Sequence, residues 1–401
     1  MGYGTAVQTA VGAEVPSGDV PSGGALARPS TARITTLDST RGIAALVVCL
    51  YHCLAFVHWT DGRTSHLVRG VASRLLDGAS AVDFFFVLSG FVLALPYLGT
   101  KARSLEVGDF LVRRVVRIMP TYWVGLTAAI VLRTLLAPQW SFLGIAKPLS
   151  MDWTAPLTRH DLFQHYSLIF GLNLGLIDGP IWSLGVEMQV SLILPFFIAA
   201  FTNRPGLKTV LAIMAVATLV PYIAGGSGYP FMPLFILGVV LAYYSEPLKA
   251  YFGRQSKVTR YALWITAMAL IVNRSLQFWW RFPDLRQEFV SGVGSGLAIL
   301  LVASQSPASR LLTNAPVRFL GQISYSFYLM HLPFVLAAFM LMRRISSPDW
   351  LTILVALAAA GLGSTALFYA VERPSINASR RTSGWLSRGA PDRSRVGMLN
   401  G

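Results

Sequence analysis

A histidine lies inside the apolar stretch ALVVCLYHCLAFVHW, which runs from residue 45 to residue 59. This residue, His52, follows Arg41 by eleven positions. In a helix that spacing is about three turns, so both side chains share one face and lie about 16 Å apart along the axis. A guanidinium group can hold an anion, and an imidazole ring can exchange a proton near neutral pH. The pair could therefore line one side of a channel that handles an anionic substrate.

Two carboxylates lie in other apolar stretches, Asp83 in AVDFFFVLSGF and Glu187 in IWSLGVEMQVSLILP. Counting residues from the predicted helix ends places His52, Asp83 and Glu187 in the outer half of a membrane. At similar depth, the acids could orient the histidine and tune it as a general base. Two alternatives remain open: Asp83 could serve only to start a helix, and His52 could simply bond a neighbouring carbonyl.

Three further polar residues are candidates for the same site: Ser89, Tyr328 and His331. The alternative for Ser89, beside Gly90, is close helix packing, because small residues are favoured where helices touch in membranes. For His331 the alternative is a structural contact between helices. Ionisable residues in apolar spans usually mark function, which favours including His331 in the site.

A metal site is the alternative for the cysteines that flank His52. Cys49, His52 and Cys53 fall on one helix face, but a structural zinc ion needs four ligands, and the sequence offers no second cluster with matching spacing. Cysteine also packs well as a small apolar residue. The sequence therefore predicts no metal and assigns both cysteines to packing.

The elements that position these residues are predicted to be membrane-spanning helices. Of the 401 residues, 54% are hydrophobic and only 13% are charged, a composition typical of an integral membrane protein. The backbone must satisfy its own hydrogen bonds in lipid, so the expected fold is an all-α bundle. Hydropathy predicts about ten spans: 42–59, 79–98, 118–137, 181–201, 207–224, 229–246, 261–280, 287–303, 319–342 and 350–371. The mixed segment 138–180 is expected either to lie at the interface or to dip partway in.

The distribution of basic residues predicts the orientation. With the N-terminus inside, 22 of the 33 Lys and Arg residues fall in cytoplasmic segments, 9 fall in outer segments, and the other 2 lie within spans. The positive-inside rule then favours both termini in the cytoplasm. The net charge of +15 indicates contact with anionic membrane lipids and no nucleic-acid partner. We expect a disordered tail at 1–33, the transmembrane domain at 34–375, and a basic cytoplasmic tail at 376–401.

Six motifs, taken in order, resemble acyltransferase family 3 of membrane proteins. The resemblance covers most of the chain, from about Leu37 to Pro374. The first motif matches the family's arginine and histidine, with ten residues between them, at Arg41 and His52. The motifs are LDSTRGIAALVVCLYH, VDFFFVLSGFV, FLVRRVVRIMPTYW, IWSLGVEMQVSLILP, LGQISYSFYLMHLPF and ERP.

The resemblance implies an enzyme that moves an acyl group, commonly acetyl, from cytoplasmic acyl-CoA to a hydroxyl acceptor. Arg41, Arg114 and Arg117 would bind the phosphates of the donor, because a guanidinium fork bonds two oxygens at once. Plain anchoring at the inner face is the alternative for Arg114 and Arg117. His52 would act as a general base or as a nucleophile that carries the acyl group. Asp83 and Glu187 would orient His52 or bind acceptor hydroxyls.

The expected function is therefore O-acetylation of a cell-surface or exported glycan, free or lipid-linked, by a protein of the bacterial inner membrane. Acetyl-CoA would be a substrate, and no cofactor would be bound permanently. A small-molecule or lipid acceptor is the alternative within this class. The alternative from another class is a proton-coupled transporter or flippase, in which His52, Asp83 and Glu187 would bind or relay protons.

Overall fold

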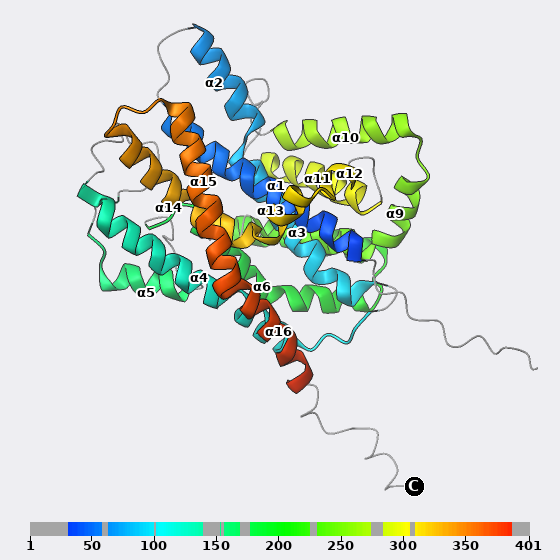
Figure 1. Ribbon diagram of the computed structural model, residues 1–401. Helices are drawn as coiled ribbons and strands as arrows, with labels where there is room; N and C mark the ends of the chain where they lie inside the picture. The colour runs from blue at the N-terminus through cyan, green and yellow to red at the C-terminus, as the bar shows by residue number, and fades with distance from the viewer. Residues whose placement is uncertain are drawn as a thin grey trace, which may run out of the picture.

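The computed structural model describes residues 31–57, 63–99, 102–138, 153, 156–168, 177–224, 231–273, 284–304 and 309–386. Within these ranges the regular structure is helical and contains no strand, which confirms the all-α prediction for this part of the chain (Figure 1). The helices are α1 (Thr31–Phe56), α2 (Arg63–Leu75), α3 (Gly78–Leu98), α4 (Val107–Leu136), α5 (Arg159–Ser167), α6 (Ile181–Thr202), α7 (Leu207–Ala224), α8 (Met232–Tyr243), α9 (Ser245–Gly253), α10 (Lys257–Val272), α11 (Asp284–Ala303), α12 (Ser309–Leu312), α13 (Ala315–Gln322), α14 (Ser324–Arg343), α15 (Asp349–Leu367), the π-helical turn η4 (Phe368–Glu372) and α16 (Arg373–Leu386).

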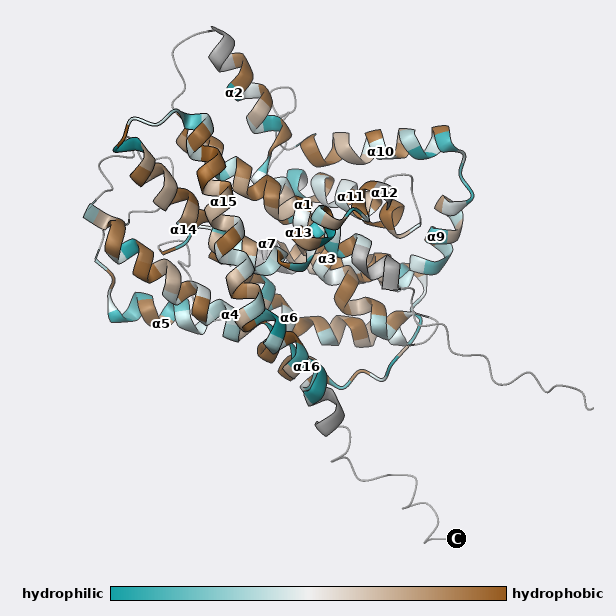
Figure 2. Ribbon diagram, viewed as in Figure 1, coloured by the Kyte–Doolittle hydropathy of each residue, from teal (hydrophilic) through white to brown (hydrophobic). Residues whose placement is uncertain are grey.

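The protein crosses the membrane several times. Each of the ten predicted spans overlaps at least one helix, and Figure 2 shows mainly hydrophobic residues along these helices. The predicted span 319–342 is divided between α13 and α14, 229–246 runs from α8 into α9, and part of 261–280 lies outside the described residues. The apolar parts described in α7, α8 and α11 are shorter than a full span: Leu207–Leu219, Met232–Tyr243 and Gln287–Ala303. The count of ten spans and the side of the termini therefore stay predictions. In the described part of the chain, six helical segments are long and apolar enough to cross a bilayer: Thr36–Phe56, Leu67–Leu98, Val107–Leu136, Ile181–Thr202, Ser324–Arg343 and Asp349–Thr382.

Helices α3 and α8 pack with their backbones in contact. A Cβ atom at Gly90 of α3 would overlap the carbonyl oxygen of Phe235, and one at Gly238 of α8 would overlap that of Val87. Small residues allow this approach, and in a membrane close packing is a main source of helix association. The packing role offered for the Ser89-Gly90 pair is confirmed at Gly90, and the contact fixes the height of Ser89 in the bundle.

The last long helical segment contains a π-helical turn. The helix α15 packs on α14, while α16 packs on α4, and η4 joins the two (Figure 1). Residues 376–386 of the predicted basic tail are part of α16. The remainder of that tail, 387–401, and residues 1–30 of the predicted disordered tail lie outside the described residues.

The segment between α4 and α6 returns to the middle of α4. Thr158 caps α5 through a reciprocal bond with Asp161. The Tyr122 hydroxyl, halfway along α4, donates to the carbonyl of His165 at 2.6 Å. Trp153 Nε1 donates to the carbonyl of Ile177 at 3.1 Å, just before α6 begins. Of the two alternatives for 138–180, dipping partway in is the one that these contacts favour. The start of α6 therefore lies deeper in the helix bundle than it would if the preceding segment stayed at the membrane surface.

Candidate active site

A cavity lies where α1, α3, α4, α6, α14 and η4 meet. It holds about 570 Å³ of empty space, counted out to the open solvent. All three arginines predicted to bind the donor line it. The lining residues are Arg41, Leu88, Ser89, Val92, Leu93, Arg114, Arg117, Ile118, Glu187, Tyr325 and Glu372.

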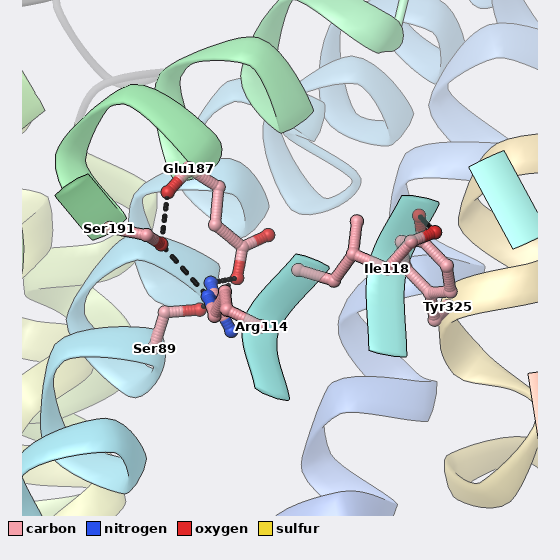
Figure 3. A network of polar contacts seen from close by, with 6 residues as sticks. All are labelled: Ser89, Arg114, Ile118, Glu187, Ser191 and Tyr325. Carbon is pink, nitrogen blue, oxygen red and sulfur yellow. Dashed lines mark hydrogen bonds and ion pairs between the residues drawn. The ribbon is translucent and has the colours of Figure 1, made fainter. Parts of the chain in front are cut away.

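One wall of the cavity is a hydrogen-bonded ion pair (Figure 3). Arg114 Nη2 lies 2.6 Å from Glu187 Oε1, and Arg114 Nε donates to Ser191 Oγ at 2.8 Å. The Ser89 hydroxyl donates to the same Glu187 oxygen at 2.9 Å. Helices α3, α4 and α6 are thus joined at one level by buried polar groups, the arrangement in which such groups are best satisfied.

This ion pair corrects the depth predicted for Glu187. Counting residues placed Glu187 in the outer half and Arg114 at the inner mouth, yet the two are in direct contact. The count assumed that α6 starts at the membrane surface, whereas it starts beside the middle of α4. Glu187 therefore lies beside the arginines. Its carboxylate accepts hydrogen bonds from Arg114 and Ser89 and none from His52 among the described residues.

Arg41 and Arg117 make no ion pair in the part of the chain that the structure describes. Arg41 is half-buried and Arg117 is exposed toward the cavity. Arg117 has Arg41, Arg114, Glu372 and Asp38 as its charged neighbours. Three guanidinium groups on one small cavity repel one another, which makes the cavity favourable for an anion.

Glu372 and Tyr325 belong to this site but were not among the predicted site residues. The Glu372 carboxylate accepts hydrogen bonds from the Ser326 amide at 3.2 Å and the Ser326 hydroxyl at 2.5 Å. The Tyr325 hydroxyl donates to the carbonyl of Ile118 at 3.1 Å (Figure 3). Glu372 is the first residue of the ERP motif and ends the long apolar run, and an acid in that position was the available signal.

A second cavity continues the first toward Tyr328. The two share Arg41, Ser89, Glu187 and Tyr325. The Tyr328 hydroxyl and the Ser183 hydroxyl are 2.7 Å apart at its far side. The second cavity is lined by Arg41, Val82, Phe85, Phe86, Ser89, Ser183, Leu184, Glu187, Ser324, Tyr325 and Tyr328.

His52 lies behind this second cavity and does not line either of the two. Its ring centroid is 5.4 Å from that of His331, which in turn is 5.6 Å from that of Tyr328. The three predicted residues therefore form a continuous row of rings that leads from the cavity to His52. Asp83 is fully buried on α3, and its proposed role stays a prediction.

Cys49 and Cys53 both have free thiols and are fully buried in the apolar core around α1 and α14. Their position is that of packing residues. Neither lines the two cavities described above.

A buried acid, Asp178, precedes α6 and gives a pH-dependent prediction. It is fully buried, and within the described residues neither carboxylate oxygen has a hydrogen-bond partner. Burial raises the pKa of the Asp178 carboxyl well above its ordinary value. The folded protein then binds this proton more tightly than the unfolded chain does, so stability is lost as pH rises above the unfolded pKa of about 4. We expect Asp178→Asn to raise the midpoint of thermal unfolding by a few degrees, and more at pH 8 than at pH 5.

Asp161 provides the matched control for that measurement. Hydrogen bonds from the Thr158 side chain and backbone lower the pKa of its exposed carboxyl. Its stabilising effect is present above the unfolded pKa and is lost only as pH falls below it. Asp161→Asn should therefore lower the stability slightly, and the loss should be the same at pH 5 as at pH 8. A stabilisation by Asp178→Asn that is no larger at pH 8 than at pH 5 would contradict the role given to burial.

Comparisons with known proteins identify the family of the chain. Residues 34–370 match the family model of acyltransferase family 3, described as an acyltransferase domain. The peptidoglycan O-acetyltransferase OatA of Listeria monocytogenes is 26% identical over 354 residues, covering 77% of this chain and 50% of that protein. The putative peptidoglycan O-acetyltransferase YrhL of Bacillus subtilis is 26% identical over 339 residues, covering 75% and 48%. The O-acetyltransferase OatA of Staphylococcus aureus is 21% identical over 329 residues, covering 75% and 50%.

The chain thus spans about half the length of the curated relatives that it matches. No solved structure matches it. The family model covers more than three quarters of the chain and includes the three arginines, the two histidines and every residue that lines the two cavities except Glu372. The chain therefore belongs to acyltransferase family 3.

Proposed function

We propose that this protein is a membrane O-acetyltransferase that moves an acetyl group from acyl-CoA to a hydroxyl of a cell-surface or exported glycan, in the bacterial inner membrane. The observation that carries the proposal is the arginine-lined cavity that continues to Tyr328, with His331 and His52 behind it. The relatives, named as peptidoglycan O-acetyltransferases, support a glycan as the acceptor.

The phosphates of the donor would bind between Arg41 and Arg117. Arg114 is already paired with Glu187, so its guanidinium group holds the cavity wall together. Arg41 and Arg117 have no such partner among the described residues, and each can offer a charged fork to phosphate. The acyl end of the donor would then extend through the second cavity toward the row of rings.

His52 would handle the proton or the acyl group at the end of that path. In direct transfer, the acceptor oxygen attacks the thioester carbonyl while the imidazole removes its proton, and the carbon–sulfur bond breaks. The proton then passes to the CoA thiolate. In the covalent alternative, the ring nitrogen attacks the thioester carbonyl first, and the carbon–sulfur bond breaks to release the CoA thiolate. The acceptor hydroxyl then takes the acyl group, the bond from acyl carbon to ring nitrogen breaks, and the hydroxyl proton passes to the thiolate. Both routes require the neutral ring and water exclusion, for which the apolar surroundings are suited.

The donor site is tested by the KM for acetyl-CoA of protein purified in nanodiscs, measured as release of CoA thiol with glycan fragments as acceptors. We expect Arg41→Gln and Arg117→Gln to raise this KM by about 10- to 100-fold, the loss expected for one charged hydrogen bond, with smaller changes in kcat. Arg113→Gln is the matched control, because Arg113 is the neighbour of Arg114 but pairs with Asp109 and does not line the cavity.

An equal rise in KM for Arg113→Gln would mean that general positive charge at the inner face is sufficient. A well-folded wild type that neither binds nor consumes acetyl-CoA would contradict the proposed function. In that case glycan-dependent proton flux, measured in sealed vesicles, would favour the transporter alternative.

A further inference from the structure

The half-buried ring of His52 on α1 lies beside the fully buried ring of His331 on α14. The rings of His52 and His331 have centroids 5.4 Å apart and an angle of 32° between their planes. Each ring has one buried nitrogen without a hydrogen-bond partner in the described part of the chain: Nδ1 of His52 and Nε2 of His331. Buried polar atoms without partners are rare and costly, so two of them on adjacent rings call for an explanation.

The other nitrogen of His331 fixes its tautomer. His331 Nδ1 lies 2.7 Å from the carbonyl oxygen of Tyr328 on the preceding turn. A carbonyl oxygen only accepts hydrogen bonds, so Nδ1 must carry the hydrogen. In the neutral ring, Nε2 is then left with a lone pair. His331 therefore offers an acceptor, held in place by its own helix.

His331 provides a nitrogen acceptor beside His52. Of the two rings described in contact with His52, those of Tyr51 and His331, that of His331 has the unpartnered nitrogen. Phe327 stacks on the other side of the contact, against the His331 ring. The carboxylate of Glu187 is bonded to Arg114 and Ser89, and that of Glu372 to Ser326.

We propose that His331 is a positioning residue: when the two rings turn toward each other, its Nε2 accepts a hydrogen bond from His52 Nδ1–H, which this structure does not yet contain, and Nε2 of His52 is left for the reaction. This inference rests on the proposed function for its catalytic meaning. When His52 Nε2 takes the proton of the acceptor hydroxyl, the Nδ1–H bond to His331 stabilises the imidazolium that forms. The proton leaves from Nε2 to the CoA thiolate, and His331 neither gains nor loses one. A second imidazole would thus take the part that a carboxylate plays in many histidine dyads.

Two amide substitutions separate this role from a purely structural one. His331→Asn retains an amide N–H near the position of Nδ1, which can still donate to the Tyr328 carbonyl, but it leaves His52 without an acceptor. His331→Gln can place an amide oxygen near the position of Nε2. We expect Asn to lower kcat by about 10²-fold or more at unchanged KM for acetyl-CoA, and Gln to recover most of that loss. The reverse order, with Asn active and Gln inactive, would overturn the proposal, because only the bond to Tyr328 would then matter.

Nitrogen NMR of the histidine side chains tests the hydrogen bond without any substrate. The chain has six histidines, and the signals of His52 and His331 can be assigned by their loss in His52→Gln and His331→Gln. At neutral pH we expect both rings neutral with hydrogen on Nδ1, and a change in the His52 Nδ1 shift in His331→Asn. Hydrogen on Nε2 of His331, or a charged His331 ring, would overturn the proposal. Tautomers as expected in a protein that does not turn over acetyl-CoA would instead contradict the proposed function alone.

Discussion

His52→Ala is expected to lower kcat for acetyl-CoA turnover by at least about 10³-fold, with little change in the KM for acetyl-CoA. The substitution removes the group that accepts the proton or carries the acyl group, contributions that reach about 10²- to 10⁴-fold for a positioned base. The KM should be almost unchanged because the arginines that would bind the phosphates line the cavities, whereas His52 lines neither of them. The measurement is steady-state release of CoA thiol by protein in nanodiscs.

The control for His52→Ala is Cys53→Ala, the neighbouring position on the same helix. Cys53 is fully buried and lines neither cavity, so its loss should lower thermal stability slightly and leave kcat almost unchanged. Size-exclusion profiles and unfolding midpoints establish that both variants are folded. A folded His52→Ala protein that turns over at the wild-type rate would show that His52 is not catalytic.

Gly90→Ala is expected to prevent folding of the protein or to destabilise it by more than about 3 kcal/mol, beyond the usual cost of overpacking a core. The new methyl group would overlap the backbone oxygen of Phe235, and backbone cannot move aside as a flexible side chain can. Helices α3 and α8 would have to separate, which would also displace Ser89 from Glu187. The yield of monodisperse protein and its unfolding midpoint measure this effect.

Gly361→Ala is the matched control, because Gly361 also lies inside an apolar helix, α15, but a Cβ there meets no atom within 4 Å. Replacing an unconstrained helical glycine with alanine stabilises a helix by up to about 1 kcal/mol. We therefore expect an equal or higher unfolding midpoint for Gly361→Ala. A Gly90→Ala protein with the wild-type midpoint would mean that α3 and α8 do not need their close contact.

The helices and much of the site could be predicted from sequence because lipid restricts the alternatives. Apolar runs in a bilayer must be helical, and every predicted span overlaps at least one helix. The few polar residues in those runs then have few possible positions in the bundle. Arg41, Arg114, Glu187, Ser89 and Tyr328 were all singled out, and all line the two connected cavities.

The parts that could not be predicted depend on where a helix starts and on breaks in its period. The depth of Glu187 follows from the return of the chain to Tyr122, which hydropathy alone does not specify. The neighbour of His52 is a histidine from α14, and residue types alone suggested a carboxylate instead. Glu372 enters the cavity through a π-helical turn, and no periodic pattern predicts such a turn.

That π-helical turn can be described as a phase shift within one helix. A π-helical turn accommodates one extra residue, and a residue of an α-helix corresponds to about 100° of rotation. The rows of side chains before and after Phe368–Glu372 are therefore out of step, so α15 can face α14 while α16 faces α4. Removing one residue from the turn would restore a regular period. The same side chains would then follow in order, but Glu372 and all of α16 would be rotated away from their present partners.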